Sequence, residues 1–189
     1  MEELVFIGLG SNVGHHYTNC VRGIREVLSD RRASLKALSS LYYTSPISSI
    51  PQPDILNGAF TIEWGDSATE LLSLLKQIER RMGRRERGRN APRIIDLDIL
   101  LFGKTVIRLP DLVVPHPRLH DRRFALIPCL EIDPSLVHPV FQKRLNELLD
   151  SIEEEQSVSW FCAIGEGDVL STCDGLPDIA ICSSRIKAS

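Results

Sequence analysis

The chain has 189 residues and a formal net charge of −3, with 43% hydrophobic and 25% charged residues. These values are ordinary for one globular domain with enough material for a core, and they argue against a protein built mainly to coat nucleic acid. The five cysteines are scattered and include no Cys-x-x-Cys pair, so neither a disulfide framework nor a zinc site is predicted. The same cysteine pattern predicts a cytoplasmic protein. The apolar run near the N-terminus is far too short to span a bilayer, so we expect no membrane partner.

The first third of the chain predicts strands and one helix. Branched apolar residues predict a buried strand at residues 4–8, and the glycine-containing loop after it matches no phosphate-binding motif. Apolar residues at helical spacing between Tyr17 and Leu28 predict a helix. Two further strands are expected at residues 33–43 and 56–64, and three prolines between them predict a long surface loop.

A second helix is predicted to lead directly into an arginine-rich loop. Ser67 and Glu70 form a capping-box pattern, and apolar residues at helical spacing extend this helix to about Met82. Glu79, near its end, is expected to pair with an arginine or to contact a ligand. Residues 80–93 contain seven arginines among fourteen positions, and glycine and proline interrupt any helix there. Arginine carries a permanent charge and a planar fork that matches phosphate oxygens, so this loop is a candidate for binding anions.

The stretch after the loop predicts a strand at residues 94–102 that carries two aspartates. Because side chains alternate across a strand, Asp96 and Asp98 are expected on one face with their Cα atoms about 6.5–7 Å apart. The opposite, core-facing side is expected to carry Ile95, Leu97, Ile99 and Leu101. A glycine and a lysine at the end of the strand predict a tight hairpin turn into residues 105–107.

Asp96 and Asp98 place two carboxylates on an otherwise apolar strand, where they repel each other and are costly to desolvate unless cations or donors compensate them. Mg²⁺ is the natural compensating ion, because it prefers oxygen ligands, takes one or two protein carboxylates and completes its octahedron with water and substrate phosphates. The alternatives are that both aspartates face solvent, or that they pair with neighbouring arginines in a structural network. The adjacent arginine-rich loop favours a site for a Mg²⁺-polyphosphate ligand.

The last third of the chain contains one candidate functional histidine. Prolines on both sides of His116 restrict its backbone and three arginines follow it, so a functional and a structural role both stand. Apolar residues at helical spacing between Leu145 and Ile152 predict a final helix. Residues 156–189 are rich in Ser, Gly, Cys and Asp and lack helical periodicity, so this extension is expected to be loosely ordered or to add a strand.

The order of the predicted elements indicates an α+β fold. Strand, helix, strand, strand, helix, strand is the βαββαβ order of a ferredoxin-like sandwich, to which a hairpin and a C-terminal helix are added. We therefore expect one domain at residues 1–155 and a C-terminal extension of unassigned role at residues 156–189.

Seven short motifs occur together in this chain. They are Gly10-Ser-Asn, Tyr42-x-Thr44, Gln52-Pro-Asp-x-Leu-Asn57, Glu79-x-x-x-Gly-Arg84, Pro92-Arg-x-x-Asp-Leu-Asp-Ile99, Pro115-His-Pro-Arg118 and Arg122-x-Phe124. In this combination, the sequence resembles the hydroxymethyldihydropterin pyrophosphokinase family over roughly residues 4–152. Members of this folate-pathway family transfer a pyrophosphoryl group from ATP to the hydroxymethyl group of a dihydropterin. The resemblance implies that the partners are two small-molecule substrates, ATP and hydroxymethyldihydropterin, and we expect a monomer.

The resemblance also assigns roles to residues of this chain. Asp96 and Asp98 would hold two Mg²⁺ ions that bridge the ATP phosphates and the attacking hydroxyl group. The implied catalytic residues are these two aspartates together with Arg84, Arg87 and Arg93. The implied ATP-binding residues are Glu79, Arg93, Ile99, His116 and Arg122. The implied pterin-binding residues are Thr44, Ile55, Asn57 and Phe124, with Asn57 hydrogen-bonding the ring and Phe124 stacking on it.

The sequence departs from the family pattern at the pterin pocket and in the arginine-rich loop. Ile55 stands where many members have an aromatic residue, so the pterin is expected to stack on one face only. Asn90 and Ala91 replace a common tryptophan and glycine, and the loop is one residue shorter than in some relatives. The alignment of the loop arginines is therefore open, and Arg87 is the preferred second arginine of a phosphate-covering lid.

Three other interpretations stay open at this point. An Asp-x-Asp strand also serves other Mg²⁺-dependent nucleotidyl or phosphoryl transferases. The chain is also consistent with the N-terminal part of a fusion with dihydropteroate synthase. An RNA-binding module on a ferredoxin-like sheet is disfavoured, because the paired sheet aromatics of such modules are missing and two aspartates would lie against the RNA.

Overall fold

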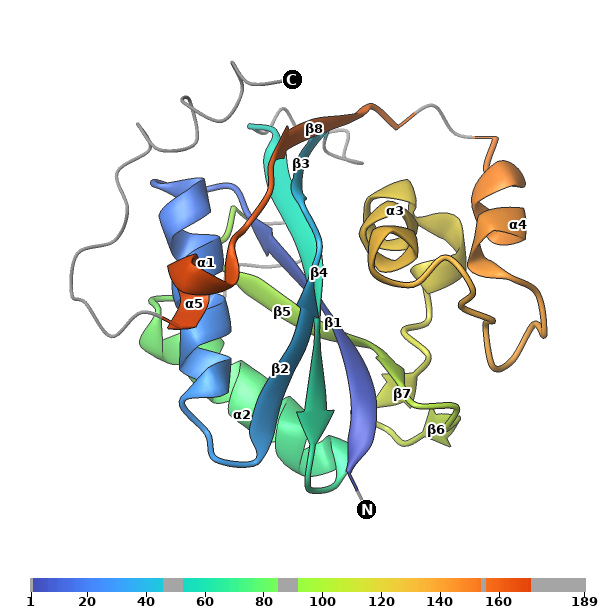
Figure 1. The fold of residues 1–189 in the computed structure, drawn as a ribbon, viewed down its shortest axis with the longest axis horizontal. Coiled ribbons are helices and arrows are strands. Elements are labelled where there is room, and N and C mark those ends of the chain that lie inside the picture. The colour runs from blue at the N-terminus through green and yellow to red at the C-terminus, as the bar shows by residue number, and fades with distance from the viewer. Residues whose placement is uncertain (1, 46–52, 85–91, 154–155, 171–189) are drawn as a thin grey trace.

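The protein is built around one antiparallel sheet that is covered by helices on both faces (Figure 1). The structure, a computed structural model, describes residues 2–45, 53–84, 92–153 and 156–170. The sheet consists of β1 (Glu3–Ser11), β2 (Ala33–Leu38), β3 (Leu41–Thr44), β4 (Ile55–Trp64), β5 (Asp96–Phe102) and β8 (Val158–Cys162). Its strand order is β5-β1-β4-β3-β8, and β2 also pairs with β4. The expected mixture of helices with an antiparallel sheet is therefore confirmed.

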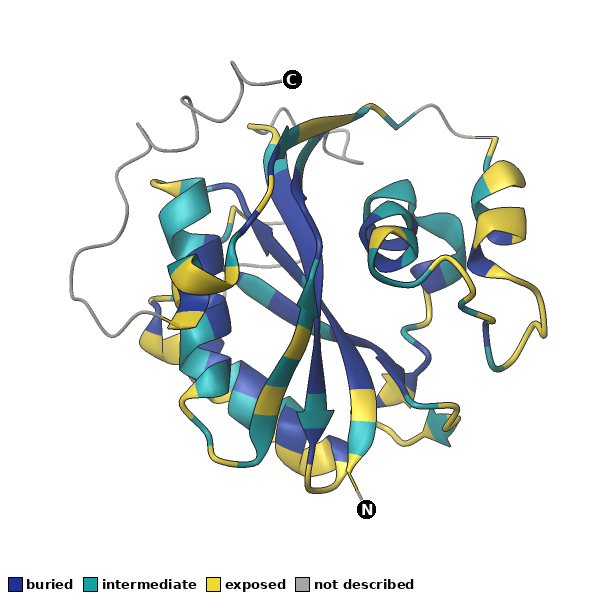
Figure 2. Cartoon of the chain, viewed as in Figure 1, coloured by how far each residue is buried: buried dark blue, intermediate teal, exposed yellow. Residues whose placement is uncertain are grey.

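The helices divide between the two faces of the sheet (Figure 1). One face carries α1 (His16–Leu28), α2 (Ala68–Arg81) and α5 (Glu166–Leu170), and the other carries α3 (Arg123–Ile132) and α4 (Leu145–Asp150). Each face has its own buried apolar cluster, so β4 is buried along most of its length (Figure 2). The sequence predicted α1, α2 and α4 but assigned no element to the apolar segment that forms α3. No helix in the described part of the chain has the length and apolar character needed to cross a membrane.

The prediction of one continuous strand at residues 33–43 was wrong, because Ser39 and Ser40 separate β2 from β3. The hydroxyl of Ser39 accepts a hydrogen bond from the backbone N–H of Ala59 at 2.9 Å. In a continuous strand, a backbone carbonyl would accept this bond instead. The backbone N–H and the hydroxyl of Ser40 both donate to the carboxylate of Glu131 in α3, at 2.9 and 2.7 Å. The break is thus a tertiary contact with α3, which hydrophobic alternation along the strand does not report.

β5 changes the direction of its side chains part-way along. Its register with β1 shifts, so Leu100 is an extra residue without a direct partner, which is the arrangement of a β-bulge. Ile99, before the bulge, lies in the apolar cluster that faces α1 and α2, as predicted. Leu101, after the bulge, lies instead in the cluster that faces α3. The placement of Leu101 from strict alternation was wrong, because one extra residue inverts the faces of those that follow.

The hairpin predicted after β5 forms with a different partner. The chain turns at Gly103, whose φ is 52°, and the backbone N–H of Thr105 donates to the carbonyl of Phe102 at 2.9 Å. The next strand, β6 (Ile107–Arg108), pairs with β7 (Val113–Val114) in a separate two-stranded sheet. Pairing with β5 was the wrong expectation, because side chains of α2 and the backbone of the segment after β7 already bond to the outer edge of β5.

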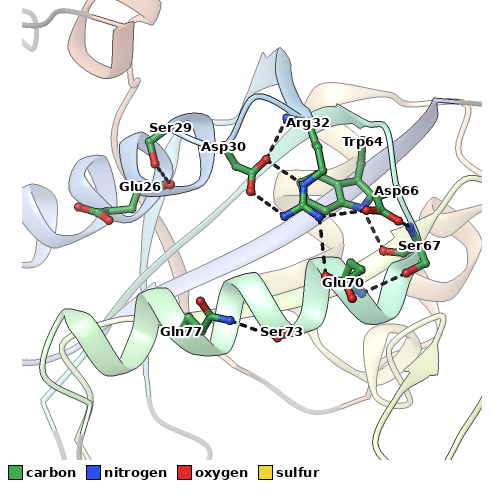
Figure 3. A network of polar contacts seen from close by, with 10 residues as sticks. All are labelled: Glu26, Ser29, Asp30, Arg32, Trp64, Asp66, Ser67, Glu70, Ser73 and Gln77. Atoms are coloured by element: carbon green, nitrogen blue, oxygen red, sulfur yellow. Dashed lines mark hydrogen bonds and ion pairs between the residues drawn. The ribbon is translucent and has the colours of Figure 1, made fainter.

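Arg32 ties together two turns at the end of the sheet that carries the N-terminus (Figure 3). Its guanidinium bonds to Asp30 at 2.8 and 3.0 Å and to Asp66 at 3.0 Å, and it lies 4.7 Å from the centre of the Trp64 ring. Beside it, the hydroxyl of Ser67 accepts the backbone N–H of Glu70 at 3.2 Å, which is one half of the predicted capping box. The other half does not form, because the backbone N–H of Ser67 donates to Asp66 at 2.7 Å. These contacts hold the start of α2 against the end of the sheet.

Residues 158–170 add to the same sheet and core. β8 pairs with β3 at the edge of the sheet, so one of the two expectations for this extension, an added strand, is confirmed for residues 158–162, and residues 171–189 lie outside the described part of the chain. Arg25 of α1 donates two hydrogen bonds to the carbonyl of Asp168 in α5, at 3.0 and 2.7 Å. Cys162, Ile164 and Val169 lie in the apolar cluster that faces α1 and α2. The domain boundary at residue 155 stays a prediction, with β8 and α5 packed against the elements that precede it.

Candidate active site

The predicted acidic and amide side chains meet across a part of β1 that has no side chains on that face. Gly8 lies directly opposite Asp98, and Gly10 lies opposite Asp96 on one side and opposite Asn57 of β4 on the other. Directly paired residues of antiparallel strands project their side chains to the same face. The two aspartates and Asn57 therefore border the same strip of bare backbone, on the face of the sheet that carries α3.

Asp96 is held by two arginines of the arginine-rich loop, Arg84 and Arg93. One oxygen of its carboxylate accepts a hydrogen bond from Arg84 at 2.7 Å, and the other accepts one from Arg93. Burial pushes the pKa of Asp96 upward, but the charges of Arg93 and Arg84 outweigh it and leave the pKa below its usual value. The arginine–aspartate pairing left open by the sequence is thus present, and Asp96 is a carboxylate rather than a carboxylic acid.

Glu79 is almost fully buried and connects α2 to the outer edge of β5. One carboxylate oxygen accepts the backbone N–H of Leu97 at 2.8 Å and an ion pair from Lys76 at 2.9 Å, and Arg84 pairs with the other oxygen. Burial raises the pKa of Glu79 above its usual value, and Lys76 only partly opposes this. The predicted pairing of Glu79 with an arginine is confirmed, and the same carboxylate covers a backbone group at the sheet edge.

Lys76 belongs to this cluster although sequence reasoning did not single it out. Its Nζ atom lies 2.9 Å from Glu79 and 3.6 Å from Asp98, and it donates to the carbonyl of Leu97 at 3.3 Å. The available signal was its position three residues before Glu79, because residues at that spacing share one face of a helix.

Asn12 joins the loop after β1 to the segment before β5. Its side-chain oxygen accepts the backbone N–H of Arg93 at 2.7 Å, and its own backbone N–H donates to the carbonyl of Arg93 at 3.1 Å. Asn12 is buried, so these bonds are shielded from water. The Gly10-Ser-Asn motif therefore serves to position Arg93, a role that discounting this loop as a phosphate-binding motif had missed.

Glu79, Asp96 and Asp98 form an acidic cluster, and the charge of Asp98 acts on both His116 and Arg122. The backbone N–H of His116 donates to the carbonyl of Leu100 at 2.9 Å, and its ring Nδ1 accepts the N–H of Arg118 at 3.1 Å. Burial lowers the pKa of His116, and the nearby carboxylate of Asp98 opposes this shift. Burial also lowers the pKa of Arg122, Arg118 adds to the effect, and Asp98 again opposes it. His116 is thus held next to Leu100, two residues beyond Asp98 on β5, and the charge of Asp98 acts on both His116 and Arg122.

Three of the four predicted pterin-binding residues form one hydrogen-bonded group. The amide of Asn57 donates to the hydroxyl of Thr44 at 2.7 Å and to the carbonyl of Ile55 at 3.3 Å. Phe124 comes from the first turn of α3 and packs against the apolar cluster on this same face of the sheet. The Arg122 guanidinium lies 5.4 Å from the centre of the Phe124 ring. The amide group and the aromatic ring are therefore supplied to one face from different elements.

Two predicted residues are not placed in the site by their side chains. The side chain of Ile99 is buried in the cluster that faces α1 and α2, on the opposite side of the sheet from the aspartates. Its backbone belongs to β5, the strand at the edge of the sheet. Arg87 lies outside the described residues.

The carboxylates of Asp96 and Asp98 suit a hard divalent cation that takes its remaining ligands from water and from phosphate groups. Asp96 and Asp98 offer carboxylate oxygens on one face of the sheet. Together with Glu79 they carry three negative charges, which form ion pairs with three cations, Lys76, Arg84 and Arg93. Among the residues that the structure describes, no cluster of three or more His, Cys, Asp or Glu side chains is arranged to hold a metal ion. Zinc and calcium sites recruit more protein ligands than this, whereas Mg²⁺ is commonly held by one or two carboxylates plus substrate phosphates.

Comparison with known proteins identifies similar sequences along most of the chain. A family model described as 7,8-dihydro-6-hydroxymethylpterin-pyrophosphokinase (HPPK) matches residues 6–134. The 2-amino-4-hydroxy-6-hydroxymethyldihydropteridine pyrophosphokinase of Aquifex aeolicus is 35% identical over 160 residues, which are 85% of this chain and 96% of the relative. A protein of the same name from Bacillus subtilis is 38% identical over 132 residues, or 70% of this chain and 79% of the relative.

Longer proteins also contain a similar region. The folate synthesis bifunctional protein of Arabidopsis thaliana is 41% identical over 131 residues, which are 69% of this chain but 27% of that protein. The solved structure of Plasmodium falciparum HPPK-DHPS aligns with a TM-score of 0.64 at 14% identity, over 79% of this chain and 43% of that one. At this identity, the structural likeness concerns the fold alone.

Proposed function

This chain belongs to the 7,8-dihydro-6-hydroxymethylpterin-pyrophosphokinase family, and we propose that it transfers a pyrophosphoryl group from ATP to the hydroxymethyl group of 6-hydroxymethyl-7,8-dihydropterin, releasing AMP. Family membership rests on the match at residues 6–134 and on relatives that are 35% and 38% identical. The reaction belongs to folate biosynthesis, as the names of several relatives indicate, among them the folic acid synthesis proteins of Dictyostelium discoideum and Schizosaccharomyces pombe.

The observation that carries this proposal is the strip of bare β1 backbone between an acidic pair and an amide. Asp96 and Asp98 border it on one side and Asn57 on the other, with Gly8 and Gly10 between them. A carboxylate pair suits a metal-bound polyphosphate, and a buried amide suits the polar edge of a heterocycle. One flat molecule with a reactive hydroxyl can therefore contact Asn57 while its hydroxyl points toward the acidic side.

Asp96 and Asp98 would hold Mg²⁺, and we propose two ions. When bound, Mg²⁺ neutralises the charge on the polyphosphate and orients it for an in-line displacement. The chain's own contribution is positioning: Glu79 and the backbone of Leu97 hold β5 against α2, and Asn12 holds the backbone of Arg93. The aspartates are thus presented from a rigid strand, as a preorganised site requires.

Arg84 and Arg93 are proposed to bind phosphate oxygens once the charge of Asp96 is shared with a metal. In the structure they neutralise Asp96. When Asp96 binds a metal instead, the N–H groups of Arg84 and Arg93 are free to donate to the oxygens of a phosphate group beside it. We assign His116 and Arg122 to the nucleotide phosphates on the Asp98 side, and the backbone of Ile99 to the nucleotide. Glu79 acts here by holding Arg84, and Arg87 is proposed as the second arginine of a lid.

The pterin is proposed to lie between the sheet and the start of α3. Asn57, oriented by Thr44, would bond to the ring edge, and Phe124 would stack on one face of the ring. Ile55 would contribute an aliphatic contact where many relatives have an aromatic ring. The other finer parts of the proposal are a ferredoxin-like arrangement of β1, β3, β4 and β5 with α1 and α2, a monomeric state and a cytoplasmic location.

The test is the identity of the nucleotide product. The protein is incubated with ATP and Mg²⁺, with and without 6-hydroxymethyl-7,8-dihydropterin, and the nucleotides are separated by chromatography. AMP that appears only when the pterin is present supports the proposal. ADP in place of AMP indicates transfer of a single phosphoryl group and refutes it.

A further inference from the structure

Lys76 connects two acidic groups that have different roles in the site. Its Nζ atom is 2.9 Å from the buried carboxylate of Glu79 and 3.6 Å from Asp98. Within the part of the chain that the structure describes, it is the one lysine or arginine that forms an ion pair with Asp98. The position of Lys76 is therefore set by Glu79 and Leu97, whereas its contact with Asp98 is the loosest of its three contacts.

The cations of the cluster differ in how easily each can leave its carboxylate. Arg84 and Arg93 hold Asp96 through hydrogen-bonded pairs in which every side chain is at most 28% exposed. The pair of Lys76 with Asp98 is longer, and its side chains are 35% and 39% exposed. Ion pairs that are more exposed and lack good geometry contribute least free energy. A cation entering the cluster therefore displaces Lys76 from Asp98 at the lowest cost.

We propose that Lys76 occupies the cation position at Asp98 before a divalent metal arrives, and that it thereby weakens metal binding when no nucleotide is present. Lys76 stays tethered by Glu79 after it leaves Asp98, so its charge remains a few ångströms away and continues to oppose the metal. A polyphosphate ligand removes this opposition because it brings negative charge to both cations. Lys76 is thus a positioning residue that makes metal binding depend on the nucleotide. This inference rests on the proposed function only in taking Asp98 as a metal ligand.

The test measures metal binding to the free protein rather than turnover. Mn²⁺ is used as the probe, and its free concentration is followed by electron paramagnetic resonance without ATP or pterin. Lys76→Gln should lower the Kd for Mn²⁺ about tenfold, the order expected for removing one unit charge close to a partly exposed site. Lys76→Arg keeps the charge and should bind Mn²⁺ as weakly as the wild type.

Two controls separate this local effect from general electrostatics and from folding. Lys36 forms an ion pair with Glu63 at 2.6 Å, with exposure similar to that of the Lys76–Asp98 pair but in another part of the sheet, so Lys36→Gln should leave Mn²⁺ affinity unchanged. In an Asp98→Asn background, Lys76→Gln should lose most of its effect. Near-ultraviolet circular dichroism checks that each variant is folded.

The inference is overturned if Lys76→Gln binds Mn²⁺ no more tightly than the wild type, if Lys36→Gln tightens binding equally, or if Lys76→Arg tightens it as much as Lys76→Gln does. If Lys76→Gln does not fold, Lys76→Met removes the same charge with an unbranched side chain and is held to the same outcomes. Because Mn²⁺ binding is read without substrates, a protein that makes no AMP refutes the proposed reaction and leaves this result standing.

Discussion

Replacing Asp96 with asparagine tests whether the acidic cluster stabilises the fold as well as forming the site. Two isolated carboxylates on a strand would repel each other, and removing one would stabilise the protein. In the structure, Asp96 instead neutralises Arg84 and Arg93, and its pKa lies below the usual value because these charges outweigh its burial. Asp96→Asn should therefore lower the free energy of unfolding.

The size of the loss follows from the exposure of the pairs. Breaking a fully buried pair costs about 3–5 kcal/mol, and an exposed pair contributes about 0.2–1 kcal/mol. Asp96 is 26% exposed and Arg84 is 25% exposed, so the expected loss at neutral pH is about 2 kcal/mol. Asp98→Asn is the matched control, because Asp98 is more exposed and its ion pair is 3.6 Å long, and the expected change is within about 0.5 kcal/mol.

Urea unfolding, followed by circular dichroism at several pH values, measures both differences. A carboxyl group whose pKa is depressed in the folded state contributes stability that is present above its unfolded pKa, about 3.9, and is lost as the pH falls through the folded value. The gap between the wild type and Asp96→Asn should therefore be largest near neutral pH and should shrink below about pH 4. An Asp96→Asn protein as stable as the wild type, or a gap that widens in acid, refutes the reasoning.

Three further substitutions or deletions test the surroundings of the site. A Cβ atom at Gly10 would meet the Asn57 side-chain oxygen at 2.8 Å, so Gly10→Ala should weaken pterin binding about tenfold or more in calorimetry, whereas Gly167→Ala, with nothing within 4 Å, should not. Tyr42 donates to Glu131 of α3 at 2.8 Å, so Tyr42→Phe should cost about 1 kcal/mol in urea unfolding, and an unchanged midpoint contradicts this. Ending the chain after residue 155 removes β8, α5 and three buried apolar side chains. The free energy of unfolding should therefore be lower by at least about 2 kcal/mol than that of a chain that ends after Leu170. Equal stability of the two proteins would show that residues 156–170 lie outside the folding unit.

The positions of the two aspartates were predictable because they depend on local periodicity. Alternation placed Asp96 and Asp98 on one face, and this is correct because the bulge in β5 comes after Ile99. The same rule failed at Leu101, because a bulge depends on how β5 is aligned with β1, which is not a property of either segment alone. Sequence reasoning is thus reliable here up to the first irregularity in pairing.

The approach of distant residues to one site was not predictable from periodicity. Gly10 lies between Asp96 and Asn57 only because β1 is placed between β5 and β4, and strand order is a tertiary property. Family resemblance supplied the residues of the site without their geometry. Lys76 is absent from the family motifs quoted above, and its contact with Asp98 appears only when α2 is packed against the edge of β5.

The fate of the β-phosphate of ATP tests the central claim most directly. ATP that carries radioactive phosphorus at its β position is incubated with the protein, Mg²⁺ and 6-hydroxymethyl-7,8-dihydropterin, and the products are separated. Transfer of an intact pyrophosphoryl group predicts that the label appears in the pterin product and that the AMP formed is unlabelled. Label recovered in ADP, with none in the pterin, would contradict the account.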